Sequence, residues 1–260
     1  MALLVFDSGI GGLGVAAQIR ALEPAQPLIY LADNGFFPYG EKPDAALLAH
    51  IVDLIGGALA RFQPKALVVA CNTASTIALP ALRAAYRLPI IGCVPPIKPA
   101  AAASTSKTIG VLATAATVRR PYLTGLIAQF APDCTVLSLG TPALAELAER
   151  KFRGAAVEVA EVIAPLFTQP GGEAIDAIAL GCTHYSFLLP EFTALYPGIA
   201  WCDPALPVAR QTLKVTRHLP PAASAHADTA FFTGEALSPA LLAPFGFTNA
   251  ETYQSSAPCR

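Results

Sequence analysis

The chain has 260 residues, of which 54% are hydrophobic and 13% charged, and its formal net charge is −1. This composition excludes an intrinsically disordered chain, and the lack of any basic run argues against a large nucleic-acid-binding surface. No stretch reaches the roughly 18 uninterrupted apolar residues of a membrane span, and the apolar start of the chain is too short for a signal peptide. We therefore expect a cytoplasmic protein that binds neither nucleic acid nor membrane.

Short apolar runs alternate with segments of helical spacing in the first part of the chain. The predicted buried parallel strands cover 3–6, 27–33, 66–70 and 89–92. The predicted helices between them cover 12–24, 43–62 and 74–87. Pro80 lies inside the third helix and is expected either to kink it or to mark its true start. Strands and helices in this order are typical of a doubly wound α/β sheet.

The alternation stops at 93–107, where three prolines mark an expected crossing into a second domain. It then restarts. Strands are predicted at 108–114, 135–140, 174–181, 198–203 and 229–234, helices at 119–131, 154–169 and 203–219, and a loop at 220–228. The restart predicts an α/β fold of two similar doubly wound parallel-sheet domains.

The two halves also share a spacing. The first strand ends at Asp7, 64 residues before Cys71, and the first strand after the crossing ends at Thr114, 68 residues before Cys182. Ligands of α/β folds bind outside the carboxyl ends of the strands. We therefore expect one cysteine per domain, with both directed at an active site in the cleft between the domains.

Two motifs, CNTAS (71–75) and GCTHYS (181–186), place a thiol between a strand and a predicted helix start, a position that lowers a thiol's pKa. His184 lies close enough in sequence to Cys182 to take or return its proton. Short hydrogen-bonding side chains that could hold a carboxylate or an amine follow both thiols. They are Asn72, Thr73 and Thr183.

Either cysteine taken alone could be a buried structural thiol, although two in matching contexts favour a functional pair. A zinc site is not supported, because no CxxC or HxxxH spacing accompanies the candidate ligands, so we expect no metal. The remaining cysteines lack polar neighbours in the sequence and are interpreted as structural or incidental. They are Cys93, Cys134, Cys202 and Cys259.

Two further motifs follow strands. FDSGIGGLG (6–14) combines a glycine turn with a helix start, which favours an anion. Asp7 is either a solvated strand-end acid or a group beside a reacting atom, and Ser8 with the loop amides could hold a carboxylate. The second motif, Pro38-Tyr39-Gly40, is either a plain turn or one that presents a phenol and backbone amides.

Two thiols on opposite sides of a small ligand suit stereochemical inversion at a carbon atom. One thiolate removes a proton and the opposite thiol returns one to the other face. The α-proton of an amino acid is very weakly acidic, so such a site must stabilise a carbanion-like transition state. No motif indicates pyridoxal phosphate, and we expect no cofactor.

Four motifs in this order, DSGIGG (7–12), PYGEK (38–42), CNTAS and GCTHY, resemble the glutamate racemases of the cofactor-independent aspartate/glutamate racemase superfamily. DPALPVA (203–209) and FFTGE (231–235) resemble the C-terminal part of that family. The resemblance implies two α/β domains with the active site between them. The expected first domain is 1–95 joined by a returning segment, 206–260, and the second is 96–205.

The resemblance also implies residue roles. Cys71 would take the α-proton from D-glutamate, assisted by Asp7, and Cys182 would take it from L-glutamate, assisted by His184. Seven residues would hold the substrate: Ser8, Tyr39, Gly40, Asn72, Thr73, Thr117 and Thr183. The family further implies a homodimer that supplies D-glutamate for bacterial peptidoglycan.

Two alternatives remain open. One is a sister enzyme that acts on aspartate or another small amino acid. The other is a catalytically silent protein that binds an amino acid or inhibits a partner. Retention of both thiols and both assisting residues argues against the second alternative, because a pure binder needs neither thiol.

Overall fold

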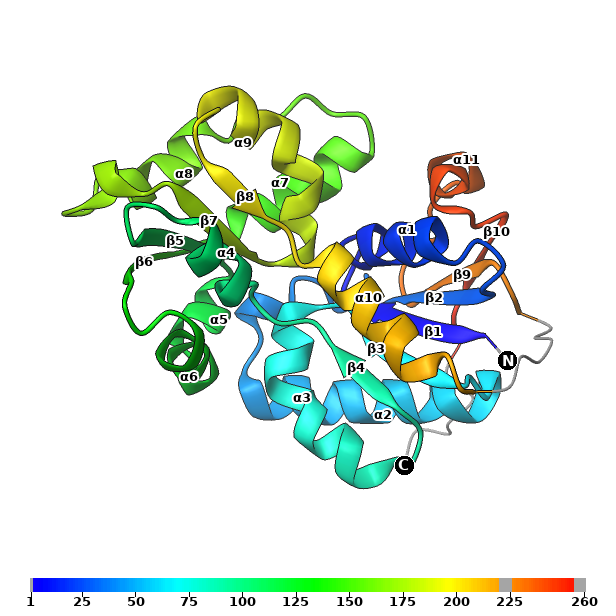
Figure 1. Ribbon diagram of the computed structural model, residues 1–260. Helices are drawn as coiled ribbons and strands as arrows, with labels where there is room; N and C mark the ends of the chain where they lie inside the picture. The colour runs from blue at the N-terminus through cyan, green and yellow to red at the C-terminus, as the bar shows by residue number, and fades with distance from the viewer. Residues whose placement is uncertain (1, 220–225, 255–260) are drawn as a thin grey trace. The chain divides into compact units, whose positions relative to one another are not determined.

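The computed structural model describes residues 2–219 and 226–254. The chain forms two compact units, each built on its own parallel sheet (Figure 1). Unit 1 consists of Met1–Cys93 and Ala205–Arg260, and unit 2 of Val94–Pro204.

The sheet of unit 1 has six strands in the order β10-β9-β2-β1-β3-β4, and every pair is parallel. Its central strands are apolar and buried along their whole length, as expected for a parallel sheet covered on both faces. The strands are β1 (Leu3–Asp7), β2 (Leu28–Ala32), β3 (Ala66–Val69), β4 (Ile90–Gly92), β9 (Thr229–Phe232) and β10 (Asn249–Thr252).

Helices cover both faces of this sheet (Figure 1). α1 (Gly12–Leu22) packs with α10 (Ala205–Thr216), and α2 (Asp44–Phe62) packs with α3 (Asn72–Ala85). α2 is long and apolar enough to span a membrane by length and composition alone. Its apolar side chains, such as Ile51, instead join the core of unit 1. The shorter elements are η1 (Tyr39–Glu41), α11 (Pro239–Leu242) and η4 (Ala243–Phe245).

Unit 2 has a four-stranded parallel sheet in the order β6-β5-β7-β8. Its strands are β5 (Thr108–Ala113), β6 (Thr135–Gly140), β7 (Ala177–Gly181) and β8 (Ala200–Cys202). The surrounding elements are α4 (Ile97–Ala103), α5 (Ala115–Arg119), α6 (Pro121–Phe130), α7 (Ala143–Phe152), α8 (Ala160–Phe167), η2 (Gly172–Ala174), η3 (Thr183–Leu188) and α9 (Leu189–Leu195). Side chains of α4 and α6 pack in one core with those of β5 and β7.

The two sheets repeat one another. The order β6-β5-β7-β8 reproduces β2-β1-β3-β4, so β5 corresponds to β1, and β7 to β3. The prediction of two similar doubly wound parallel-sheet regions is confirmed. The strands that precede Cys71 and Cys182, β3 and β7, occupy equivalent positions in the two sheets.

Several local features differ from the predictions or were not predicted. The stretch 93–107, which interrupts the alternation, contains helix α4, whose Pro99 lies in the first turn, where a missing N–H costs no helical hydrogen bond. Pro80 lies inside α3, which begins at Asn72, so Pro80 does not mark the start of this helix. The helix expected at 154–169 is the shorter α8. Elements α7, α9 and β10 were not predicted. Within the expected loop 220–228, residues 220–225 lie outside the described part of the chain.

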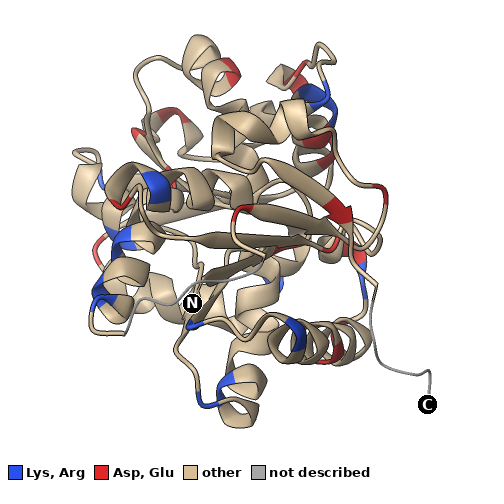
Figure 2. Ribbon diagram, turned by 90° about the vertical axis from the view of Figure 1, so that its right-hand side faces the viewer, with Lys and Arg blue, Asp and Glu red and all other residues tan. Residues whose placement is uncertain are grey.

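Lys, Arg, Asp and Glu residues are spread over many elements of the chain, and basic and acidic segments both occur over the ribbon (Figure 2). This distribution agrees with the near-zero net charge and does not form a basic stripe among the described residues.

Candidate active site

Cys71 lies two residues beyond the last residue of β3 and is the N-cap residue of α3. The strand β1, which pairs with β3, ends at Asp7, and Ser8 follows it. The chain connects β1 to α1 on one face and β3 to α3 on the other, so β1 and β3 flank the point where the strand order reverses. Open α/β sheets bind ligands at this point. The Sγ atom of Cys71 lies 3.6 Å from Oγ of Ser8.

Asp7 is fully buried, and its Oδ1 atom accepts a hydrogen bond from the amide of Gly9 at 2.9 Å. The alternative of a solvated strand-end acid is therefore wrong. Gly12 allows α1 to begin this close to the acid, because a Cβ atom at position 12 would lie 2.9 Å from Cβ of Asp7 and 3.1 Å from Cβ of Ala70. The sequence FDSGIGG thus holds a carboxylate inside the unit.

The PYG motif forms the short helix η1, which contains Tyr39 and Gly40. The buried hydroxyl of Tyr39 donates to Oδ2 of Asp33. Burial raises the pKa of the Tyr39 phenol well above 10, and the charges of Asp33, Cys71 and Asp7 raise it further. The phenol is therefore a hydrogen-bond donor that lies in the electrostatic field of both Cys71 and Asp7.

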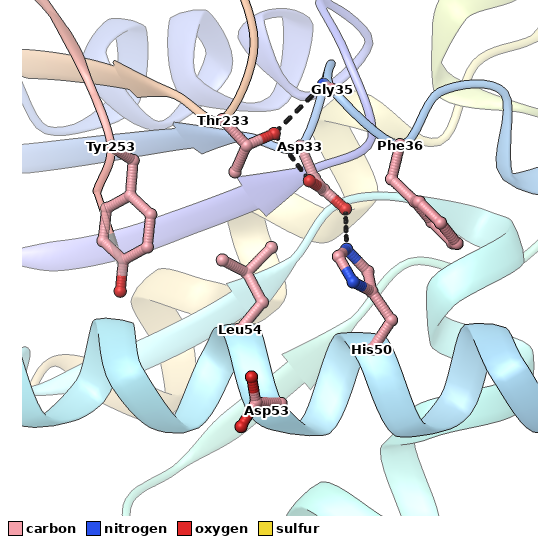
Figure 3. A pocket seen from close by; sticks show the side chains of 8 residues that line it. All are labelled: Asp33, Gly35, Phe36, His50, Asp53, Leu54, Thr233 and Tyr253. Carbon is pink, nitrogen blue, oxygen red and sulfur yellow. Dashed lines mark hydrogen bonds and ion pairs between the residues drawn. The ribbon is translucent and has the colours of Figure 1, made fainter. Parts of the chain in front are cut away.

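Asp33, which sequence reasoning missed, directly follows β2 and accepts the hydrogen bond from Tyr39. Its Oδ2 atom also contacts Nε2 of His50 at 2.6 Å, and its Oδ1 atom accepts a hydrogen bond from Thr233 at 2.6 Å (Figure 3). Asp33 is 1% exposed, so this carboxylate depends on its three partners. The only available signal was its position at a strand end, which it shares with Asp7.

A cavity of about 290 Å³ lies beside this network. Figure 3 shows the side chains that line it, which come from α2 and from the residues that follow β2, β9 and β10. Eight residues line it: Asp33, Gly35, Phe36, His50, Asp53, Leu54, Thr233 and Tyr253. None of the predicted site residues is among them. The cavity therefore adjoins the support of Tyr39 but is distinct from the Cys71 cluster.

Asn72 and Thr73 are the first two residues of α3, and both are buried. Oδ1 of Asn72 accepts a hydrogen bond from the thiol of Cys93 at 3.3 Å. Nδ2 of Asn72 is buried and has no hydrogen-bond partner among the described residues. The interpretation of Cys93 as a thiol without polar neighbours is therefore wrong.

In unit 2, Cys182 follows β7 and is the N-cap residue of η3, which begins with Thr183 and His184. Sγ of Cys182 lies 4.0 Å from Nδ1 of His184. On the other side of the imidazole, Nε2 lies 3.1 Å from Oε1 of Glu149, which comes from α7. His184 is 2% exposed. Sequence reasoning missed Glu149, because α7 itself was not predicted.

Thr117 lies in α5, just past the carboxyl end of β5, the strand paired with β7. Thr114 is the N-cap of α5, and its hydroxyl oxygen accepts a hydrogen bond from the amide of Thr117 at 3.2 Å and lies 3.0 Å from the Thr117 hydroxyl.

The buried hydroxyl of Tyr185, the residue after His184, donates to the carbonyl of Thr141 at 2.9 Å. Burial, and secondly the charge of Cys182, raise the pKa of Tyr185 well above 10.

The predicted site residues thus form two clusters, one in each unit. The cluster of unit 1 comprises Asp7, Ser8, Tyr39, Gly40, Cys71, Asn72 and Thr73, and that of unit 2 comprises Thr117, Cys182, Thr183 and His184. Of the other cysteines, Cys134 and Cys202 pack against the apolar core of unit 2, and Cys259 lies outside the described residues. In residues 2–219 and 226–254, no three His, Cys, Asp or Glu side chains are grouped to hold a metal ion.

The chain is similar in sequence to known racemases. The family model Asp/Glu/Hydantoin racemase matches residues 14–212. A glutamate racemase of Granulibacter bethesdensis is 49% identical over 89% of this chain and 88% of its own length. One of Sphingopyxis alaskensis is 45% identical over 96% of both chains.

Solved structures give the same result. The crystal structure of Escherichia coli glutamate racemase in complex with L-glutamate and the activator UDP-MurNAc-Ala has a TM-score of 0.88 and 39% identity, covering 96% of this chain and 97% of its own. The family model, the sequence identities and the fold lead to one conclusion: the chain belongs to the Asp/Glu/hydantoin racemase family, among its glutamate racemases.

Proposed function

We propose that this protein interconverts L- and D-glutamate by a mechanism in which Cys71 and Cys182 exchange the α-proton with the substrate. Family membership makes it an amino-acid racemase. The observation that supports the two-thiol mechanism is the repeat itself. Each unit has a cysteine at the carboxyl end of the equivalent strand, and each cluster contains a buried proton-exchanging group, Asp7 in one and His184 in the other.

The mechanism assigns one thiol to each face of the α-carbon. The Cys71 thiolate removes the proton of D-glutamate, and the Cys182 thiol then donates a proton to the opposite face. The reverse reaction starts from L-glutamate with the Cys182 thiolate. Asp7 assists Cys71, and His184, whose Nδ1 is 4.0 Å from the thiol sulfur, takes or returns the proton of Cys182. No external cofactor takes part.

The substrate's carboxylates and amine would be held by side chains and backbone amides around the two thiols. Hydroxyl and carboxamide donors suit a dicarboxylate, and they stabilise the negative charge that develops when the α-proton leaves. The residues proposed for this role are Ser8, Tyr39, Gly40, Asn72, Thr73, Thr117 and Thr183. The E. coli relative has been crystallised with L-glutamate, which supports glutamate as the substrate class.

In the cell we propose a cytoplasmic homodimer that supplies D-glutamate for peptidoglycan. The dimer is tested by light scattering coupled to size-exclusion chromatography. A mass of twice that of the chain is expected, and a single-chain mass across the working concentration range would contradict it.

The activity is tested with pure L- and D-glutamate in deuterated water, after treatment of the protein with hydroxylamine and a chelator. Optical rotation should decay to zero, with deuterium at the α-carbon of the product and little in the unreacted substrate. The low deuterium content of the unreacted substrate identifies two separate proton-exchanging groups, because a single group would return solvent deuterium to both faces of the α-carbon.

Cys71→Ala and Cys182→Ala should each abolish racemisation, whereas the control Cys134→Ala should retain it. Activity in the double variant would overturn the mechanism. Exchange with aspartate but not with glutamate would assign the chain to the sister enzyme, and ligand binding without any exchange would indicate a binding or inhibitory protein.

A further inference from the structure

In the side-chain carboxamide of Asn72, the oxygen accepts a hydrogen bond and the nitrogen donates none among the described residues. Its Nδ2 atom is buried and has no hydrogen-bond partner among the described residues, although the residue is 1% exposed. A buried amide donor without an acceptor is unfavourable, so such an atom at a candidate site indicates a ligand that supplies the acceptor. Asn72 directly follows Cys71, and the substrate proposed above carries carboxylate oxygens.

The other end of the carboxamide is held by Cys93, whose thiol donates to Oδ1 at 3.3 Å. Cys93 is itself fixed. Its side chain is fully buried, and its amide donates to the carbonyl of Val69 at 3.0 Å and to Oγ of Ser75 at 3.0 Å. Oγ of Ser75 in turn donates to the same Val69 carbonyl at 2.9 Å. The thiol therefore comes from a rigid junction between β4, β3 and α3.

This contact determines which way the carboxamide points. An asparagine amide has an acceptor on one side and a donor on the other, and a half-turn about its last bond exchanges them. A thiol that donates to Oδ1 favours the orientation in which Nδ2 is free to donate elsewhere. The reversed orientation would direct an oxygen at the substrate, and two oxygen acceptors repel each other when one is a carboxylate.

We propose that Cys93 is a positioning residue that orients Asn72 so that Nδ2 donates to a carboxylate oxygen of the substrate. The inference rests on the proposed function. It gives a binding role to a cysteine that takes no part in proton transfer. It also predicts a defect in substrate affinity rather than in the chemical step.

The test is steady-state kinetics of Cys93→Val, Cys93→Ala and Cys93→Ser with both enantiomers. Val and Ala remove the donor, and KM should rise about fivefold to tenfold while kcat stays within about twofold of the wild type. Because the enantiomers have equal free energy, kcat/KM must fall by the same factor in both directions. Ser retains a hydroxyl donor and should restore KM to within about twofold.

The matched control is Cys202→Val, which removes a half-buried thiol of unit 2 and should leave KM unchanged. A second measurement separates orientation from packing. Asn72→Ala should raise KM by itself, and Cys93→Ala added to Asn72→Ala should raise it no further, because Cys93 acts only through the carboxamide. If the two substitutions raise KM additively, the inference is wrong, whatever effect Cys93→Val has on the midpoint of thermal unfolding.

The outcomes also distinguish the two proposals. If the wild type turns over glutamate and Cys93→Ala keeps the wild-type KM, the inference about Cys93 fails and the proposed function stands. If the wild type does not exchange the α-proton of glutamate, the proposed function fails, and the inference fails with it.

Discussion

His184 is held between two partners, with Nε2 at 3.1 Å from Oε1 of Glu149 and Nδ1 at 4.0 Å from Sγ of Cys182. Glu149 is oriented from its own helix, since Oε2 lies 3.8 Å from the guanidinium of Arg153 one turn later. A carboxylate that binds one imidazole nitrogen directs the other nitrogen at the reacting group. Glu149 contacts the imidazole nitrogen opposite the one that faces the thiol, so we expect it to act as a positioning residue for His184.

Glu149→Gln should therefore lower kcat by roughly tenfold to 100-fold, because His184, the proposed general acid and base, loses the carboxyl group that orients it. KM should remain within about twofold, since no substrate contact is proposed for Glu149. Steady-state kinetics checks both constants. Glu146→Gln, an exposed acid on the same helix, is the control. A wild-type kcat in Glu149→Gln would show that His184 does not depend on this contact.

The sequence predicts the two thiols and their nearest partners because these are adjacent in the chain or end neighbouring strands. Cys182 and His184 are two residues apart, and Asp7 and Cys71 lie at the carboxyl ends of the paired strands β1 and β3. Glu149 lies 35 residues before His184 on α7, a helix that was not predicted. Its role depends on how α7 packs against η3, which no local pattern reveals.

The contacts that hold Tyr39 through Asp33 also could not be predicted from a local sequence pattern. The hydroxyl of Thr233 reaches Asp33 across 200 residues, because β9 pairs with β2. β9 itself was predicted as a possible last strand from its apolar residues. β10 was not, because this edge strand has the sequence NAET and is largely exposed, so burial leaves no apolar pattern in it.

Gly12→Ala should destabilise the protein and reduce activity together. A Cβ atom at this position would lie 2.9 Å from Cβ of Asp7, so the start of α1 or the acid must shift. Overpacking of this kind costs about 1–3 kcal/mol of unfolding free energy. Gly14→Ala in the same helix is the control. Its nearest neighbour would be 4.0 Å away, and it should be neutral or stabilise by about 0.5–1 kcal/mol. Urea unfolding measures both, and equal effects would contradict the steric argument.

Tyr39 and Tyr185 should ionise only as the chain unfolds. Burial is the main cause that raises both pKa values well above 10 in the folded state. The stability that these neutral phenols contribute is therefore complete below about pH 10, the unfolded-state pKa, and is lost as the pH rises above it. Absorbance at 295 nm after a jump to high pH should show a slow phase that follows unfolding. Tyr39→Phe and Tyr185→Phe should each reduce its amplitude, and an unchanged slow phase would contradict the prediction.

Asp176 should make the unfolding free energy depend on acid pH. Oδ2 of Asp176 accepts hydrogen bonds from the amide and hydroxyl of Thr105 and from the amide of Ser106, at 2.7–2.8 Å. Burial acts to raise the pKa of Asp176, but these bonds and one from Ser104 together outweigh it and hold the pKa well below 3.8.

A depressed folded-state pKa contributes stability above the unfolded-state pKa and loses it as the pH falls toward the folded-state value. The difference in unfolding free energy between wild type and Asp176→Asn should therefore be constant above about pH 5 and should shrink steadily at lower pH. Urea unfolding of both proteins from pH 7 down to the lowest pH at which they fold measures the difference. If the difference does not change over this range, the charged form of the Asp176 carboxyl group does not stabilise the loop between α4 and β5.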